Sequence, residues 1–296
     1  MTTKPKVVLA GGSGFIGEYI KQKLDALNYD VVMISRRKPA ITWNDKEGMT
    51  EALENAEMVI NLAGKSVNCR YNEKNKQEIM TSRVGTTRLL GDAINRCSTP
   101  PKLWINASTA TIYRHADDRP MTEEDGEYGT GFSVDVAKKW EKAFFSFQLP
   151  HTRQVALRIA IVLGPNGGVM TPYKNLVKFG LGGIQGNGQQ MFSWIHIEDV
   201  FQIMMFLKER NDLSGVFNCS SPKPVPNYIF MNAMRQKLNR TYGLPTPKPL
   251  LEIGATFIRT ETELVLKSRW VLPEKLQQAG YVFQYPSISG ALGDLL

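Results

Sequence analysis

A glycine-rich segment near the start of the chain constrains the fold more than any other feature. Its sequence, residues 11–17, is Gly-Gly-Ser-Gly-Phe-Ile-Gly. It follows a short apolar run at residues 6–10 with the β-branched content of a buried strand, and it precedes residues 18–27, whose apolar positions recur at helical spacing. Glycines at this spacing between a strand and a helix are typical of a dinucleotide-binding turn.

Each glycine of the segment has a distinct expected task. Gly11 permits the tight turn, Gly14 lets the backbone approach a pyrophosphate, and Gly17 lets the helix pack close to the strand. The free N–H groups at the start of the helix would face the phosphates. Gly12, Ser13, Phe15 and Ile16 complete the predicted cofactor-binding loop. The alternative is a glycine-rich turn that binds no ligand.

The end of the second predicted strand, residues 29–35, indicates which dinucleotide would bind. An acidic residue that bonds the ribose 2′-hydroxyl usually ends this strand in NAD-binding units. Here Ser35 stands at that position, and Arg36 and Arg37 follow it. A guanidinium can bind a 2′-phosphate through two hydrogen bonds, whereas a carboxylate would repel it. The sequence therefore favours NADP(H), with solvated arginines at a strand end as the alternative.

Strand-like and helical segments continue to alternate after this point. The pattern predicts strands at residues 41–43, 57–64, 102–108 and 153–162, and helices at residues 49–55, 73–96 and 130–149. Such alternation implies an α/β fold with a doubly wound parallel sheet of the Rossmann type, covered by helices on both faces. Leu62, Ala63 and Gly64 end the strand at residues 57–64 and are expected beside the first glycine loop, where ligands bind in open sheets.

The composition changes after residue 163. We expect residues 1–163 to form the NADP(H)-binding domain, with residues 191–220 returning to it. Residues 164–190 and 221–296 would form a smaller, mainly helical lobe that caps the sheet on the substrate side. Residues 180–190 contain five glycines, which would either shape the substrate side or form a plain flexible loop.

Composition narrows the class of partner. The chain has 296 residues and a formal net charge of +8, which is spread along the sequence. This charge suits a small anionic substrate, although a solvated basic surface explains it equally well. We find no nucleic-acid motif, no apolar run long enough to span a membrane and no signal peptide. Three scattered cysteines offer no metal site and favour the cytoplasm; the oligomeric state stays open.

Motifs along the chain form a recognisable set. The first group consists of the glycine loop, Asn61–Gly64, Ser108–Tyr113 and Trp194–Val200. With these, the chain resembles the extended short-chain dehydrogenase/reductases, the group that includes nucleotide-sugar epimerases. The second group consists of Gly180–Gly183, Phe192–Ile197, Ser268–Pro273, Ala279–Tyr281 and Tyr285-Pro286. With these, the chain is similar to an atypical branch, the epimerase family with a C-terminal domain of unknown function. The resemblance covers nearly the whole chain, and it implies a Rossmann domain, a NADP(H)-like cofactor and oxidoreductase or epimerase chemistry.

The chain departs from this family at the catalytic residues. Ordinary members carry a Ser or Thr, together with a Tyr that stands four residues before a Lys on one helix. Thr109 matches the Ser/Thr position. Lys138 matches the lysine only if Val134 replaces the tyrosine, and Lys139 would place Asp135 there. The phenol that usually exchanges the proton is therefore missing from this helix.

Several side chains could replace the missing phenol or keep part of its task. Tyr113, in the loop expected to border the cofactor, is a candidate acid, or else a cleft-lining aromatic residue. Lys138 could still bond the ribose hydroxyls, or lie in solvent. Tyr128, Asp135 and His196 are weaker candidates. The alternative for Asp135 is a solvated helix carboxylate, and the alternative for His196 is a structural role. The predicted catalytic set is Thr109, Tyr113 and Lys138.

Two classes of function stay open at this point. The first is a NADP(H)-dependent oxidoreductase or epimerase of a small molecule, in which Thr109 orients the substrate oxygen. The second is a non-catalytic NADP(H)-binding protein that senses redox state or regulates a partner. Val134 at the tyrosine position favours the second class, and the glycine loop is compatible with both.

Overall fold

A seven-stranded parallel sheet forms the centre of the molecule in the computed structural model, which describes residues 4–165, 167–247 and 267–296. The strand order is β10-β6-β5-β4-β1-β2-β3, and every neighbouring pair is parallel. The strands are β1 Lys6–Ala10, β2 Asp30–Ser35, β3 Ile41–Thr42, β4 Met58–Asn61, β5 Leu103–Thr109, β6 Arg153–Ile159 and β10 Gly215–Cys219. The predicted Rossmann-type fold is confirmed.

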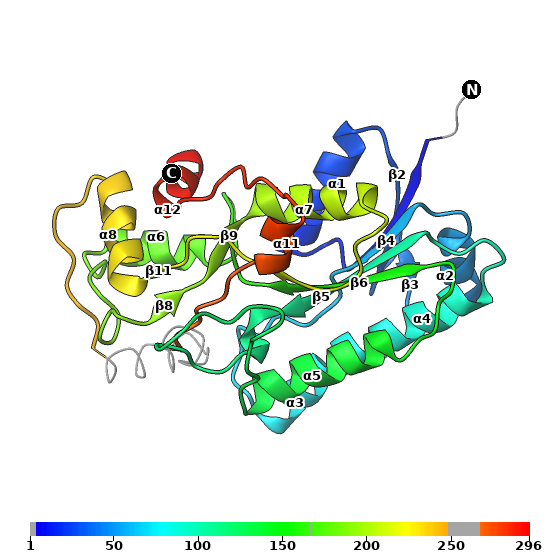
Figure 1. Cartoon of the computed structure of the whole chain (residues 1–296), viewed down its shortest axis with the longest axis horizontal. Helices are drawn as coiled ribbons and strands as arrows, with labels where there is room; N and C mark the ends of the chain where they lie inside the picture. The colour runs from blue at the N-terminus through cyan, green and yellow to red at the C-terminus, as the bar shows by residue number, and fades with distance from the viewer. Residues whose placement is uncertain (1–3, 166, 248–266) are drawn as a thin grey trace.

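Helices cover both faces of the sheet (Figure 1). Alternate residues of a strand point to opposite faces, so Val7 and Leu9 of β1 join one apolar core, while Val8 and Ala10 join the other. The first face carries α1 Phe15–Ala26, α7 Ile197–Glu209 and α11 Glu274–Gln278. The second face carries α2 Lys46–Leu53, α4 Thr86–Arg96 and α5 Phe132–Phe145. Both faces are therefore buried, which explains why the strands are continuously apolar.

A smaller group of elements packs at one end of the sheet, at the left of Figure 1. Its apolar core is separate from the two cores of the sheet and includes Trp194, Phe230 and Leu292. Its helices are α6 Met170–Lys178, α8 Asn227–Lys237 and α12 Ile288–Leu295. Its short strands are β7 Ile161–Leu163, β8 Met191–Phe192, β9 Trp194–His196 and β11 Val225–Pro226. The expected domain boundary at residue 163 stays a prediction.

Two predicted elements are divided in the structure. The strand expected at residues 153–162 breaks at Ala160, after which β7 leaves the sheet to pair with β9. The helix expected at residues 73–96 consists of α3 Glu73–Met80, a π-helical turn η1 Thr81–Gly85 and α4. A π-helical turn holds more residues than an α-helical one, and such turns often mark functional sites.

Other predicted boundaries shift by a few residues. Helix α2 begins before the expected residue 49, because the Asp45 side chain accepts a hydrogen bond from the Gly48 N–H at 2.9 Å and caps the helix there. The expected helix at residues 130–149 is shorter in the structure, as α5. Prolines are expected to interrupt the helices of the C-terminal lobe. Pro245 and Pro247 lie in a described segment without a helix, whereas Pro249 lies outside the described residues.

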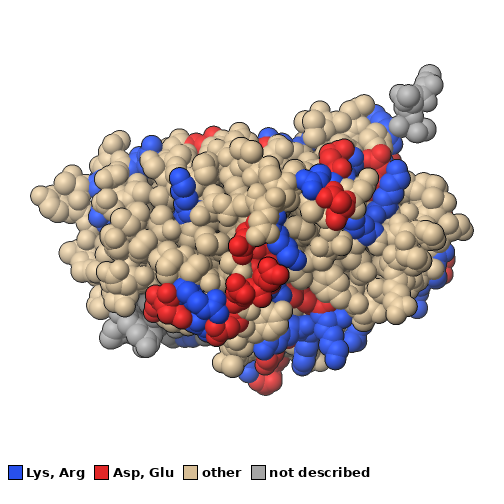
Figure 2. Space-filling view, in the orientation of Figure 1, with Lys and Arg blue, Asp and Glu red and all other residues tan. Residues whose placement is uncertain are grey.

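The strand order identifies where a ligand would sit. Strand β1 lies between β2 and β4, so the chain leaves β1 in one direction and returns to the other side of it. The loops after β1 and β4 diverge at this point, and ligands of open α/β sheets bind in the resulting crevice. On the molecular face of Figure 2, basic and acidic side chains lie next to one another. None of the described helices is long and apolar enough to cross a membrane.

Candidate functional site

The glycine loop forms one wall of a cavity of about 360 Å³ at this crevice. Gly11 has φ +76°, and a Cβ atom there would lie 2.6 Å from the Ala63 backbone nitrogen. A Cβ atom on Gly17 would lie 2.5 Å from the Gly12 Cα, so the start of α1 packs directly on the loop. A Cβ atom on Gly14 would meet only the Gly11 oxygen, at 3.7 Å, which leaves open space above it. These three environments match the turn, the packing contact and the ligand approach expected of the three glycines.

The first turn of α1 faces the cavity with free donors. Gly14 caps this helix and has no side chain that could accept from its first N–H groups. Phe15, Ile16 and Gly17 all line the cavity. An anion at this position would therefore meet both unsatisfied N–H groups and the positive end of the helix dipole.

A second pocket lies at the end of β2. Ser13, Ser35, Arg36 and Arg37 line it, and the two guanidinium groups are exposed. The Ser35 hydroxyl donates to the Arg37 carbonyl oxygen at 2.9 Å and accepts from the Arg37 N–H at 3.2 Å, which fixes this turn. In the described part of the chain, neither guanidinium has a carboxylate partner. The pocket thus fits a phosphate held by two arginines.

The three predicted residues of the loop after β4 stand in different relations to the cavity. Leu62 lines the cavity, and the Ala63 N–H donates to the Asn61 side chain at 3.1 Å. Gly64 is packed against the Arg83 side chain, since a Cβ atom there would lie 3.0 Å from the guanidinium carbon. Of the three predicted residues, Leu62 therefore borders the cavity, while Ala63 and Gly64 shape its surroundings.

A buried polar network supports the far wall of the cavity, which is the wall opposite the glycine loop and includes Thr109 and Trp140. The Asn61 amide donates to Asn106 at 2.7 Å and to Thr87 at 3.2 Å, and the Trp140 indole donates to Thr87 at 2.9 Å. These residues belong to β4, β5, α4 and α5, so the network joins four elements. Satisfied buried networks of this kind fix side-chain positions. Trp140, which lines the cavity, is thereby held in one orientation.

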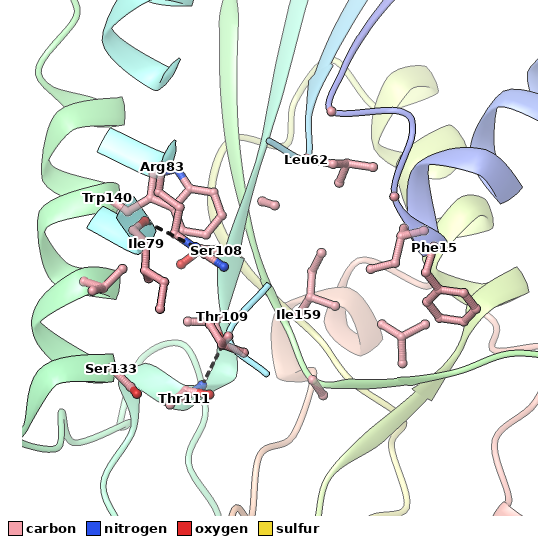
Figure 3. Close-up of a pocket in the computed structure, with 18 of the residues that line it drawn as sticks. Phe15, Leu62, Ile79, Arg83, Ser108, Thr109, Thr111, Ser133, Trp140 and Ile159 are labelled. Atoms are coloured by element: carbon pink, nitrogen blue, oxygen red, sulfur yellow. Dashed lines mark hydrogen bonds between the residues drawn. The ribbon is translucent and has the colours of Figure 1, made fainter. Parts of the chain in front are cut away.

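Hydroxyl groups concentrate on this far wall (Figure 3). The Thr109 hydroxyl accepts from the Thr111 N–H at 3.1 Å, which leaves its own hydrogen free to donate. The Ser133 hydroxyl lies 3.4 Å from the Tyr71 hydroxyl, and both residues line the cavity. Among the described residues, Tyr71 is the one phenol on the wall. Thr109 is therefore placed where its predicted role requires, and that role stays a prediction.

The face of α5 that borders the cavity differs from the one expected. Ser133, Val136 and Trp140 line the cavity from this helix. Val134 is fully buried elsewhere, and Lys138 is exposed, with its ammonium donating to the Gly129 carbonyl oxygen at 3.3 Å. Successive residues of a helix are rotated by about 100°, so residues 134 and 138 lie on a different face from residues 133, 136 and 140. The structure does not bring Lys138 to the cavity.

Tyr113 does not line the cavity either. Its side chain is 1% exposed, and its hydroxyl donates to Asn218 at 2.8 Å and accepts from Arg158 at 2.8 Å. Burial raises the pKa of this phenol, with Arg158 opposing the shift. Tyr128 accepts a hydrogen bond from the same guanidinium at 2.8 Å. This geometry gives Tyr113 a structural place in a buried cluster rather than access to the cavity.

His196 lies in the smaller group of elements, at the start of α7. Its Nδ1 atom accepts from the Glu198 N–H at 3.2 Å and caps that helix, while its ring packs on Tyr285. Burial lowers the pKa of the imidazole. Asp135 is exposed on α5. Neither residue lines the cavity.

Sequence reasoning missed Tyr71, Arg83, Ser133 and Trp140. All four line the cavity, yet none belongs to a motif with a fixed spacing. Arg83 lies in the π-helical turn η1, which no sequence pattern predicted. Among the described residues, no group of histidine, cysteine or acidic side chains is arranged to hold a metal ion.

Comparison with known proteins gives matches over almost the whole chain. Residues 7–220 match the model of the NAD dependent epimerase/dehydratase family, and residues 246–295 match a domain of unknown function, DUF1731. The human epimerase family protein SDR39U1 is 32% identical over 299 residues, which cover 98% of this chain and 99% of the human one. The epimerase family protein ML0860 of Mycobacterium leprae is 33% identical, over 98% of this chain and 95% of its own length.

Two solved structures are similar to this chain in fold as well as in sequence. The crystal structure of human SDR39U1 with NADPH superimposes with a TM-score of 0.89 at 31% identity and covers 98% of both chains. The nucleoside-diphosphate sugar epimerase from Corynebacterium glutamicum gives a TM-score of 0.79 at 26% identity, over 99% of this chain and 58% of that one. With its parallel sheet, glycine loop and full-length relatives, the chain belongs to the NAD dependent epimerase/dehydratase family.

Proposed function

We propose that this protein is a NADP(H)-dependent enzyme that interconverts a carbonyl and an alcohol on a small molecule. The observation that carries the proposal is a single cavity that joins the glycine loop to a wall of hydroxyl groups. The separate pocket with Arg36 and Arg37 adds the preference for a 2′-phosphate. The human relative that was crystallised with NADPH supports the same cofactor.

The residues present fit a dinucleotide along this crevice. The open space above Gly14 and the uncapped first turn of α1 would receive the pyrophosphate. Arg36 and Arg37 would pair with the 2′-phosphate. Leu62 and Ile159, which are apolar residues on the cavity wall, would exclude water from the reacting end. When bound, the cofactor supplies or accepts the hydride.

Thr109 and Tyr71 would serve the oxygen atom of the substrate. The free hydrogen of the Thr109 hydroxyl donates to that oxygen and orients it. In the direction of reduction, the carbonyl carbon gains the hydride and the oxygen takes the phenolic proton of Tyr71. Tyr71 lies near enough to Arg83 for an electrostatic interaction. The phenolate then regains a proton from solvent.

A screen of NADPH oxidation against carbonyl compounds and nucleotide sugars tests this function. With a substrate in hand, Tyr71→Phe should lower kcat by about 10²–10⁴ without weakening NADPH binding. Tyr242→Phe, at a phenol that is 87% exposed, is the matched control and should keep full activity. An unchanged rate in Tyr71→Phe would remove Tyr71 from the mechanism.

The second candidate is a NADP(H)-binding protein without catalysis, which senses redox state. It is favoured by α5, which lines the cavity with Ser133, Val136 and Trp140 and offers neither a tyrosine nor a lysine there. Tight NADPH binding together with no turnover of any compound in the screen would support it. Turnover of any one compound would show that the protein is an enzyme and would exclude this second candidate.

A further inference from the structure

Arg83 is the one charged side chain among the described residues that line the cavity. It extends from η1 beside Ile79, Ser108 and Trp140 (Figure 3), and its guanidinium carbon lies 5.3 Å from the centre of the Trp140 ring. The missing side chain of Gly64 makes room for it. Burial lowers the pKa of this guanidinium to about 10, so it stays charged at neutral pH.

Half of this guanidinium is engaged by the protein. Its Nη1 atom donates to the Lys65 carbonyl oxygen at 3.0 Å and to the Ile79 carbonyl oxygen at 3.3 Å. Its Nε and Nη2 atoms donate to no described residue, and no carboxylate within the described ranges forms an ion pair with it. The Nε–Nη2 edge is the side of a guanidinium that presents two parallel N–H groups.

Two other arginines of the chain show that this edge can bind a carboxylate, whereas Arg96 uses it on the Thr50 hydroxyl and the Lys46 carbonyl oxygen, at 3.3 and 3.5 Å. Arg158 donates from Nε and Nη2 to the two carboxylate oxygens of Glu141, at 2.9 and 2.8 Å. Arg210 donates from Nε and Nη2 to the two carboxylate oxygens of Asp212, at 2.8 and 2.6 Å. The short two-bond contacts of Arg158 and Arg210 are thus made to the paired oxygens of one carboxylate. At Arg83 the Nε–Nη2 edge donates to no described residue, and the side chain lies on the wall of a cavity.

The cofactor phosphates have other partners in the proposed function. The pyrophosphate belongs to the first turn of α1, which lies across the cavity from Arg83, as the positions of Phe15 and Arg83 in Figure 3 illustrate. The 2′-phosphate belongs to the pocket at the end of β2. An anion at Arg83 is therefore distinct from the phosphate groups of the cofactor.

The geometry points to a substrate carboxylate on the Nε–Nη2 edge of Arg83. This inference rests on the proposed function, and it specifies the substrate as a small carboxylic acid with a carbonyl or hydroxyl group near Thr109 and Tyr71. A planar carboxylate matches the two parallel donors, and its charge compensates the guanidinium. The cavity of about 360 Å³ is shared with the reacting end of the cofactor, so the space beside Arg83 suits a small acid.

The experiment compares acids with their uncharged esters. Pyruvate, acetoacetate and levulinate place zero, one and two methylene groups between the carboxylate and the ketone, and their methyl esters lack the charge. Binding is followed by tryptophan fluorescence, because Trp140 lies against Arg83, with and without NADPH. At least one acid should bind wild-type protein tenfold or more tightly than its ester, which corresponds to about 1.4 kcal/mol.

Three variants assign that difference to Arg83. Arg83→Met should remove the preference for the acid, while NADPH affinity, measured by its own fluorescence, stays within twofold of wild type. Arg83→Lys should retain part of the preference, because an ammonium keeps the charge but loses the parallel donors. Arg88→Met, at an exposed arginine of α4, is the matched control and should behave as wild type.

Several results would overturn the inference. One is equal binding of acids and esters by wild type, or no binding of any acid. Another is a tenfold loss of NADPH affinity in Arg83→Met with acid binding unchanged, since the edge would then serve the cofactor. If wild type does not bind NADPH at all, the proposed function fails. Acid binding to the protein alone still tests Arg83 in that case.

Discussion

Two arginines near the carboxyl ends of the strands show how differently this chain treats buried charge. Arg158 is 2% exposed, and every nitrogen of its guanidinium donates to a side chain of Glu141, Tyr113 or Tyr128. Arg83 lines the cavity with one edge unused by the described residues. The first cluster is complete without a ligand. The second becomes complete only when something binds, which distinguishes a structural site from a functional one.

The largest expected effect follows from removing the completed arginine. Arg158→Met leaves the buried Glu141 carboxylate without its partner, and breaking a buried pair in this way costs about 3–5 kcal/mol. Urea denaturation should therefore show a much less stable protein. The double variant Arg158→Met with Glu141→Gln is the control and should recover part of the loss. A decrease below about 1 kcal/mol would mean that the cluster is not a structural unit.

The second prediction concerns the two exposed arginines at the end of β2. Changing Arg36 and Arg37 to Ala should weaken NADPH binding more than tenfold and leave NADH binding nearly unchanged, because only NADPH carries the 2′-phosphate. Both side chains are exposed, so stability should stay at the wild-type value. Fluorescence titration with each cofactor measures the effect. An equal loss for both cofactors would contradict recognition of the phosphate.

The sequence was sufficient for the fold because its signals are local. Strand and helix periodicities, together with the glycine spacing, predicted the parallel sheet and the first cofactor loop, and the end of the second strand placed Arg36 and Arg37 beside a pocket. These features depend on residues close together in the chain. Their physical cause is therefore visible without knowledge of the packing.

The far wall of the cavity could not be predicted in the same way. The choice of Lys138 depended on the rotational phase of α5, and the structure turns Val136 and Trp140 to the cavity instead. Arg83 reaches the cavity because a π-helical turn and the missing side chain of Gly64 coincide. Both are consequences of tertiary packing, and no spacing in the sequence encodes them.

The third prediction tests the arginine of the cavity by stability instead of binding. Arg83→Met should change the free energy of unfolding by less than about 1 kcal/mol or increase it, because the variant removes a charge whose burial no described carboxylate compensates. Arg158→Met in the same urea series provides the contrast. A loss above about 2 kcal/mol would show that Arg83, like Arg158, is chiefly structural, and the comparison would no longer hold.

The smallest expected effect concerns His196, which is intermediate between the fully paired Arg158 and the partly paired Arg83. Its Nδ1 atom caps α7, and its Nε2 atom lies 3.3 Å from the Asp294 carboxylate. Burial lowers the pKa of the folded imidazole, although Asp294, Asp199 and Glu198 all oppose the shift. The unfolded chain therefore takes up the proton first as the pH falls through about 6.5, and stability is lost from there toward the lower, folded pKa.

One such group changes the free energy of unfolding by at most about 1.4 kcal/mol per pH unit. Urea denaturation of wild type and His196→Asn at pH 7.5 and pH 5.5 measures it, because asparagine can still cap the helix but does not titrate. Wild type should lose more stability than the variant on acidification, since a protonated Nδ1 atom can no longer accept from the Glu198 N–H. The other titrating groups are the same in both proteins, so equal losses would mean that Asp294 compensates the buried charge fully and that His196, like Arg158, is complete.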